Sequence, residues 1–144
     1  MKKENIIVEG IYSSTIDKVW TALTNVDEMK NWYFQLEDFN PKVGFKFDFI
    51  GGPEDGVQYF HLCEVTEVED GKKITYSWRY DNYPGNSFVT WELFDKGEQT
   101  LLRLTHTGIE TLEEGGPDFA KANFVEGWTY FVHTALKRYL ETDN

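Results

Sequence analysis

The sequence contains only one cysteine, Cys63, among its 144 residues. No intrachain disulfide can form, and such low cysteine usage is typical of proteins in a reducing compartment. No stretch approaches the ~18 consecutive apolar residues that cross a bilayer, and the early apolar run Ile6-Ile7-Val8 is too short for the core of a signal peptide. The sequence therefore predicts a cytoplasmic protein without membrane insertion.

Positive charge is also scarce. The chain has 14 lysine and arginine residues against 25 aspartate and glutamate residues, which gives a formal net charge of −11. A field of this sign repels phosphates, and no stripe of basic residues interleaved with aromatic ones is present to offset it. We therefore expect no nucleic acid partner and no binding to anionic membrane surfaces.

Motifs of common catalytic sites are missing as well: the chain has no nucleophile elbow, phosphate loop, zincin helix or dinucleotide fingerprint. Its histidines are His61, His106 and His133. His61 and Cys63 share one face of a predicted strand and could supply two metal ligands, but a structural zinc site usually needs four. We expect no metal and no cofactor, and we interpret His61 as a pocket-lining histidine beside a buried thiol.

Aromatic residues, in contrast, are abundant, at 17% of the chain (Trp 5, Tyr 8, Phe 11). Each ring can bury roughly 150–250 Å² of surface. Because rings are stiff plates, a core so rich in them either interdigitates closely or leaves concave space. The length fits a single domain spanning residues 1–144, large enough to bury a core without disulfides or metals.

Hydrophobic periodicity predicts a strand over residues 4–13, followed by two short helices. The first helix begins at Ser14 or Thr15, either of which could act as its cap, and has an apolar stripe at i, i+3, i+4 and i+7 from Ile16. Asn25 repeats the capping pattern, which predicts a second helix to about Trp32.

From Gly44 onward the period changes to two, which is typical of half-buried strands. Strands are predicted near residues 44–49, 57–68, 74–80, 89–93 and 102–106, joined by short turns. Such turns favour an antiparallel meander. The step from Val65 to Val68 breaks the alternation and predicts a β-bulge.

A long amphipathic helix is predicted over about 118–141, opened by Pro117, whose missing N–H costs nothing at that position. Its wide apolar face needs a large partner, and only the concave face of the sheet is large enough. Gly127 in the middle of this helix costs roughly 1 kcal/mol relative to alanine. We interpret it as a point where a strand or a ligand approaches the helix closely, and of the two we favour the strand.

Three motifs in this order resemble the START-like (SRPBCC, helix-grip) superfamily, and within it the branch named after the activator of the ninety-kilodalton heat-shock protein ATPase. They are residues 19–24 with Trp32 after them, residues 100–108, and Gly127-Trp128 followed by residues 136–140. The resemblance implies an α+β fold: a curved antiparallel sheet of about six strands wrapped around a long C-terminal helix, with two short helices after the first strand. It also implies a cavity between helix and sheet.

We therefore hypothesise that the chain binds a small hydrophobic, aromatic or lipid-like molecule in that cavity. Aromatic and polar-tipped side chains on the inward phase of the strands and the helix are the candidate ligand-binding residues. They are Phe47, Tyr59, His61, Tyr76, Trp78, Trp91, His106, Phe124, Trp128 and Phe131.

Two alternatives belong to other classes of function. An enzyme of the cyclase or isomerase kind would use the same cavity, with His61 or His106 as its acid or base. A co-regulator of a chaperone would act through its outer surface. The sequence favours a binding module over an enzyme and assigns no catalytic residue.

Overall fold

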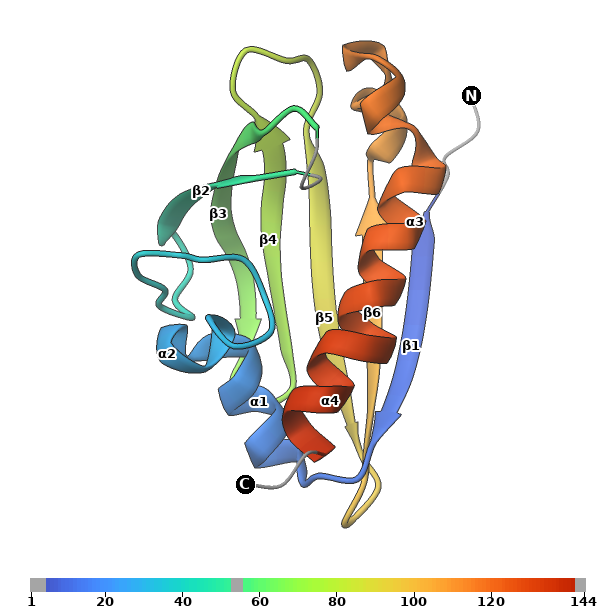
Figure 1. Ribbon diagram of the computed structural model, residues 1–144. Coiled ribbons are helices and arrows are strands. Elements are labelled where there is room, and N and C mark those ends of the chain that lie inside the picture. Colours follow the sequence, from blue (N-terminus) through green and yellow to red (C-terminus); the bar gives the residue numbers. More distant parts are fainter. Residues whose placement is uncertain (1–4, 53–55, 142–144) are drawn as a thin grey trace.

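A computed structural model describes residues 5–52 and 56–141. Six antiparallel strands form one sheet in the spatial order β1-β6-β5-β4-β3-β2 (Figure 1). The strands are β1 (Ile6–Tyr12), β2 (Lys46–Gly51), β3 (Tyr59–Glu69), β4 (Lys73–Tyr80), β5 (Ser87–Asp95) and β6 (Thr100–Thr107). The predicted meander is confirmed, and β1 joins it at one edge by pairing with the last strand, β6.

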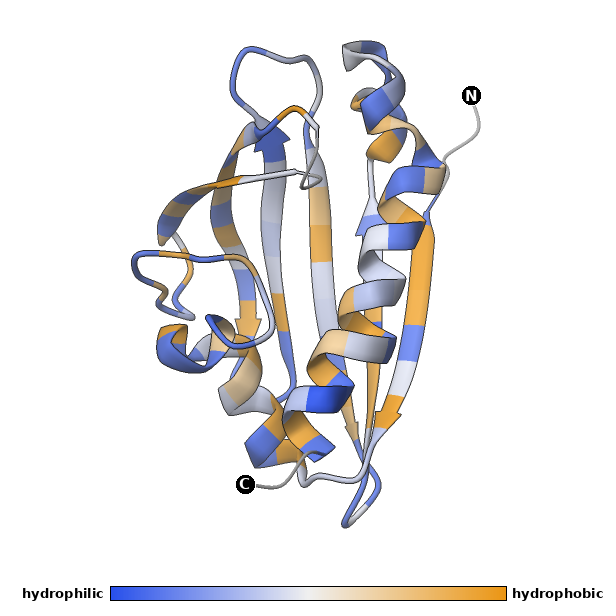
Figure 2. Ribbon diagram, viewed as in Figure 1, coloured by the Kyte–Doolittle hydropathy of each residue, from blue (hydrophilic) through white to orange (hydrophobic). Residues whose placement is uncertain are grey.

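Alternation along the strands sets one face of the sheet toward the core. Phe47 and Phe49 of β2 are buried, whereas Ile50 beside them is largely exposed, and Figure 2 shows the matching bands of hydrophobic and hydrophilic residues along β2 and β3. The register of β3 against β4 shifts between Val65 and Glu67, which confirms the predicted bulge.

Two short helices, α1 (Ile16–Thr24) and α2 (Val26–Met29), follow β1 as predicted. Asn25 caps α2, because its side-chain oxygen accepts hydrogen bonds from the backbone N–H groups of Asp27 and Glu28. The first cap differs from the prediction: Thr15 occupies the N-cap position of α1 but makes no side-chain capping bond. The second helix is also shorter than predicted, since it ends at Met29.

The C-terminal helical region begins with three short 3₁₀ turns and continues as one unbroken helix. The turns are η1 (Ile109–Thr111), η2 (Glu113–Gly115) and η3 (Pro117–Phe119); the helix consists of α3 (Lys121–Tyr130), the π-helical segment η4 (Phe131–Ala135) and α4 (Leu136–Glu141). The prediction of a single helix from about residue 118 is therefore wrong at its start. Ala120 has an extended backbone, with φ −70° and ψ 149°, and separates η3 from α3.

This helix runs across one face of the curved sheet, and α1 and α2 lie over the same face (Figure 1). The close approach of helix and sheet occurs at Gly10 of β1, where a Cβ atom would come within 2.8 Å of Val132 Cγ1. Next to it, the Tyr12 hydroxyl donates a hydrogen bond to the Val132 carbonyl inside the π-helical segment at 2.7 Å. The architecture is the α+β helix-grip fold that the sequence predicted.

Within the described residues, no helix combines the length and the apolar character that crossing a bilayer requires.

Candidate ligand-binding cavity

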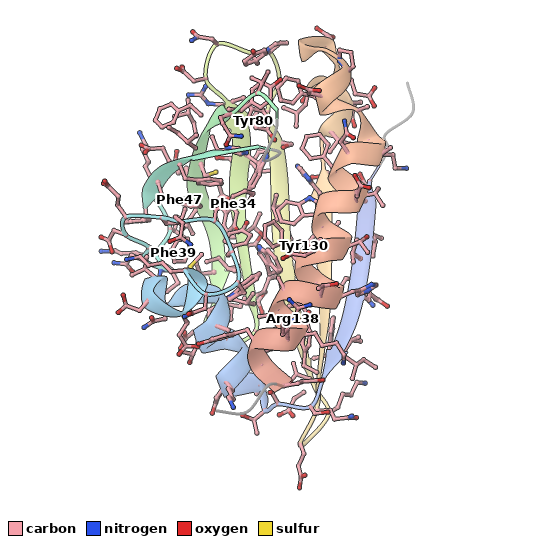
Figure 3. The ribbon with its side chains drawn as sticks, in the orientation of Figure 1. Phe34, Phe39, Phe47, Tyr80, Tyr130 and Arg138 are labelled. Carbon is pink, nitrogen blue, oxygen red and sulfur yellow. The ribbon has the colours of Figure 1, made fainter. Side chains whose placement is uncertain are left out.

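A cavity of about 560 Å³ lies between the sheet and α3. On the sheet side it is bounded by the end of β2, the start of β3 and the end of β4, and on the other side by η3 and successive turns of the C-terminal helix. Figure 3 shows two of its lining residues, Phe34 and Tyr80, on the sheet side of the molecule and a third, Tyr130, on the helix.

The buried part of the lining is mostly aromatic. Trp78, Tyr80, Phe119 and Trp128 are each at most 5% exposed. The one buried polar side chain among the lining residues is His61, whose ring stacks on Phe49 at a centroid distance of 4.4 Å. This part of the cavity therefore offers flat apolar walls with a single imidazole set into them.

His61 is held in place by its backbone environment. Its Nδ1 lies 3.0 Å from the Tyr59 carbonyl oxygen, so a ring protonated on Nδ1 donates to that oxygen. Burial lowers the pKa of His61 to about 4, although the hydrogen bonds to the carbonyls of Tyr59 and Phe49 act in the opposite direction. The imidazole is consequently neutral at pH 7.

The open end of the cavity is polar. Asp118, Asn123, Glu126 and Tyr130 line it and are exposed to solvent. The Tyr59 hydroxyl donates a short hydrogen bond of 2.5 Å to Asp118 Oδ2, and this bond raises the pKa of Tyr59 to about 12. The bond links the start of β3 to η3 across the cavity rim.

The helix contributes two neighbouring stripes to the lining. Phe124, Trp128 and Phe131, at i, i+4 and i+7, form the apolar stripe, and residues 123, 126, 127 and 130 form a second one toward solvent. Gly127 lies in the second stripe, and a Cβ atom there would meet nothing within 4 Å. The interpretation of Gly127 as a close strand contact is therefore wrong: the missing side chain leaves cavity space instead.

Six of the ten residues predicted from the sequence line this cavity, and four do not. The six are Tyr59, His61, Trp78, Phe124, Trp128 and Phe131. The other four, Phe47, Tyr76, Trp91 and His106, are buried elsewhere in the packed core.

Phe47, Tyr76 and Trp91 are separated from the cavity by the segment that follows α2. Tyr33 inserts between sheet and helix, with its hydroxyl 2.8 Å from the Tyr76 hydroxyl and its ring 5.9 Å from Trp91. Phe39 packs on Phe47 at 5.1 Å. Phe34, from the same segment, reaches the cavity itself. Sequence reasoning missed this segment, although the three consecutive aromatic residues Trp32, Tyr33 and Phe34 were a signal for it.

His106 is fully buried, and both of its ring nitrogens are hydrogen-bonded. The Trp128 indole N–H donates to Nδ1 at 3.0 Å, and the Ser87 hydroxyl lies 2.8 Å from Nε2. Burial lowers the pKa of His106 to about 3. We therefore assign His106 to the support of Trp128 behind the cavity wall rather than to the wall itself.

Among the residues that the structure describes, His61 and Cys63 have no third partner for a metal. Over residues 5–52 and 56–141, no group of three or more histidine, cysteine, aspartate or glutamate side chains is placed to hold a metal ion. Cys63 is buried, and burial raises the pKa of its thiol.

A family model described as "Activator of Hsp90 ATPase homolog 1-like protein" matches residues 13–141. A search of curated proteins found no match.

Several solved structures share the whole fold. Protein MLL2253 from Mesorhizobium loti is 28% identical with a TM-score of 0.77, covering 98% of this chain and 100% of its own. DynU16, described as a protein in the dynemicin biosynthetic locus, is 26% identical with a TM-score of 0.78, covering 98% of this chain and 48% of its own. This chain thus spans about half of DynU16. Protein BH1534 from Bacillus halodurans, 24% identical with a TM-score of 0.75, covers 98% of this chain and 100% of its own, and it shows the likeness of fold.

Proposed function

The chain belongs to the family of Activator of Hsp90 ATPase homolog 1-like proteins, and we propose that it binds a small hydrophobic molecule, aromatic or lipid-like, in the cavity between its sheet and its C-terminal helix. The observation that carries the proposal is a cavity of about 560 Å³ beside an otherwise closely packed aromatic core. Ligand pockets commonly measure roughly 300–1,000 Å³. The place of DynU16 in a biosynthetic locus supports a small-molecule function for this architecture.

Affinity would come mainly from the rings. Trp78 and Trp128, whose centroids are 5.2 Å apart, and Phe34 beside them present apolar surface to the cavity. Burying apolar ligand surface there contributes roughly 25 cal/mol per Å². Orientation would come from His61 in the wall and Asn123 at the open end, because a few polar groups in an apolar pocket fix how a ligand lies.

A second candidate function is catalysis of a proton transfer in the same cavity, since His61 is part of the lining. A general base works best when its pKa is near the working pH. The pKa of His61 is only about 4, so the free protein holds a weak base there. His106, the other histidine considered from the sequence, does not line the cavity. Binding is therefore proposed ahead of catalysis.

A chaperone-regulating function, which family membership supports only in general terms, would act through the outer surface. It makes no use of the cavity. A variant with a filled cavity therefore separates this function from ligand binding.

Titration with N-phenyl-1-naphthylamine, a neutral aromatic probe that becomes fluorescent in apolar surroundings, tests the proposed function. We expect saturable binding of one probe per chain. Gly127→Leu should abolish it, because the new side chain extends into space where a Cβ atom meets nothing within 4 Å. Circular dichroism of the same variant should show an unchanged fold.

Ala122→Leu is the matched control. Ala122 is an exposed residue of α3 that does not line the cavity, so this variant should bind the probe like the original protein. A probe signal that never saturates, or that Gly127→Leu leaves intact, would contradict cavity binding.

A further inference from the structure

The charged side chains that line the cavity are of one sign. They are the carboxylates of Asp118 and Glu126, and no lysine or arginine among the described residues joins them. Both are exposed, whereas the deeper lining residues Trp78, Tyr80 and Trp128 are buried. The cavity is thus apolar inside and negative where it opens to solvent.

Aromatic faces accompany these carboxylates. Tyr59 donates its hydroxyl hydrogen to Asp118, and Tyr130 lies one helical turn after Glu126, so their side chains share one side of α3. Tyr130 is 53% exposed, so its ring is accessible to a ligand at the open end. Carboxylates and aromatic faces both attract organic cations.

The charge of the whole chain acts in the same direction. A formal net charge of −11 raises the local concentration of cations at any concave surface and lowers that of anions. A ligand with a carboxylate or a phosphate would have to place its charge at the open end, beside Asp118 and Glu126, or bury it among rings. Either placement is unfavourable.

We propose, on the basis of the function proposed above, that the ligand carries a protonated amine on its aromatic or polycyclic body. The body occupies the apolar interior, and the amine lies at the open end, which Asp118 and Glu126 line and where water still reaches it. The cavity accordingly selects amphipathic amines over acids with the same body.

Three probes with one body test the selection by isothermal titration calorimetry: 2-(1-naphthyl)ethylamine, 2-(1-naphthyl)ethanol and 1-naphthaleneacetic acid. The amine should bind at least about tenfold more tightly than the acid, with the alcohol between them. The double variant Asp118→Asn/Glu126→Gln should bring the affinity of the amine down to that of the alcohol. The asparagine keeps an oxygen that can accept the Tyr59 hydrogen bond.

Glu113→Gln/Glu114→Gln is the control for net charge, because both residues are exposed on η2 and outside the lining. It should preserve the preference for the amine. Suppose that the alcohol binds, that Gly127→Leu blocks this binding, and that the amine and the acid bind with equal affinity. That result would overturn the charge selection alone and leave the proposed function standing. An absence of binding by all three probes would overturn the proposed function and this inference with it.

Discussion

The indole N–H of Trp128, on the C-terminal helix, donates a hydrogen bond to Nδ1 of His106, on β6, at 3.0 Å. Since Nδ1 accepts, the ring proton of the neutral histidine is on Nε2 and is donated to the Ser87 hydroxyl at 2.8 Å. The Ser87 hydroxyl in turn donates to the Trp78 carbonyl at 2.7 Å. This chain of donors joins the helix to three strands and fixes the tryptophan in the cavity wall.

Trp128→Ala should therefore destabilise the fold strongly. Trp128 is only 3% exposed, and removing a buried large ring costs about 3–5 kcal/mol. The substitution also leaves His106 Nδ1 without its donor. Urea denaturation measures the change in the free energy of unfolding. Tyr130→Ala, at an exposed ring on the same helix, serves as the comparison, and a loss below about 1 kcal/mol for Trp128→Ala would contradict the anchoring role.

Stability should fall as the pH drops below about 6.5. In the folded chain the pKa of His61 is lowered to about 4 and that of His106 to about 3, from an ordinary value of 6.5. Between these values the unfolded chain takes up protons that the folded chain does not, so the free energy of unfolding decreases with decreasing pH. From pH 6.5 to 5.5 each histidine should contribute a loss of about 1 kcal/mol.

His61→Gln removes the contribution of one of the two buried histidines. Carboxylates stay largely ionised above pH 5.5, so they contribute little to the pH dependence over this interval. The free energy of unfolding, measured by urea denaturation at each pH, should then change by about half as much over this interval. An unchanged pH dependence in the variant would show that His61 is not buried in its neutral form.

Local patterns made most of the fold predictable. The alternation of Phe47 and Phe49 with charged neighbours sets the inward face of β2, and both rings are buried as this pattern indicated. The bulge after Val65 could be read in the same way. Each of these features depends on residues close together in sequence, so a single chain is enough to reveal it.

The candidate site was only partly predictable, because its limits depend on contacts between distant segments. His61 and His106 both follow the inward phase of their strands, yet only His61 reaches the cavity. Trp128 covers His106 and donates its indole N–H to it, whereas Tyr33, from the aromatic segment after α2, packs against Trp91 and Trp128. That segment has no strand or helix period, so its position could not be read from the sequence.

Gly10→Ala should destabilise the protein by about 1–3 kcal/mol, the range for forcing extra volume into a packed core. The added Cβ atom would lie 2.8 Å from Val132 Cγ1, and Val132 is fully buried and cannot move aside freely. Thermal denaturation checks the expected loss. Adding Val132→Ala should make the Gly10 substitution less costly than it is alone, and strictly additive effects of the two changes would argue against this contact.

Gly127→Ala should do the opposite and stabilise the protein. Gly127 lies inside α3, where alanine is favoured over glycine by about 1 kcal/mol because glycine loses more backbone freedom on folding. Apart from its chain neighbours and the backbone of its own helix, no atom lies within 4 Å of the added Cβ, so no clash offsets this gain. For a chain of this length, about 1 kcal/mol corresponds to a rise of about 3 °C in Tm. The same substitution at two glycines thus gives opposite signs, and a fall in Tm for Gly127→Ala would mean that a neighbouring group occupies the space beside the helix.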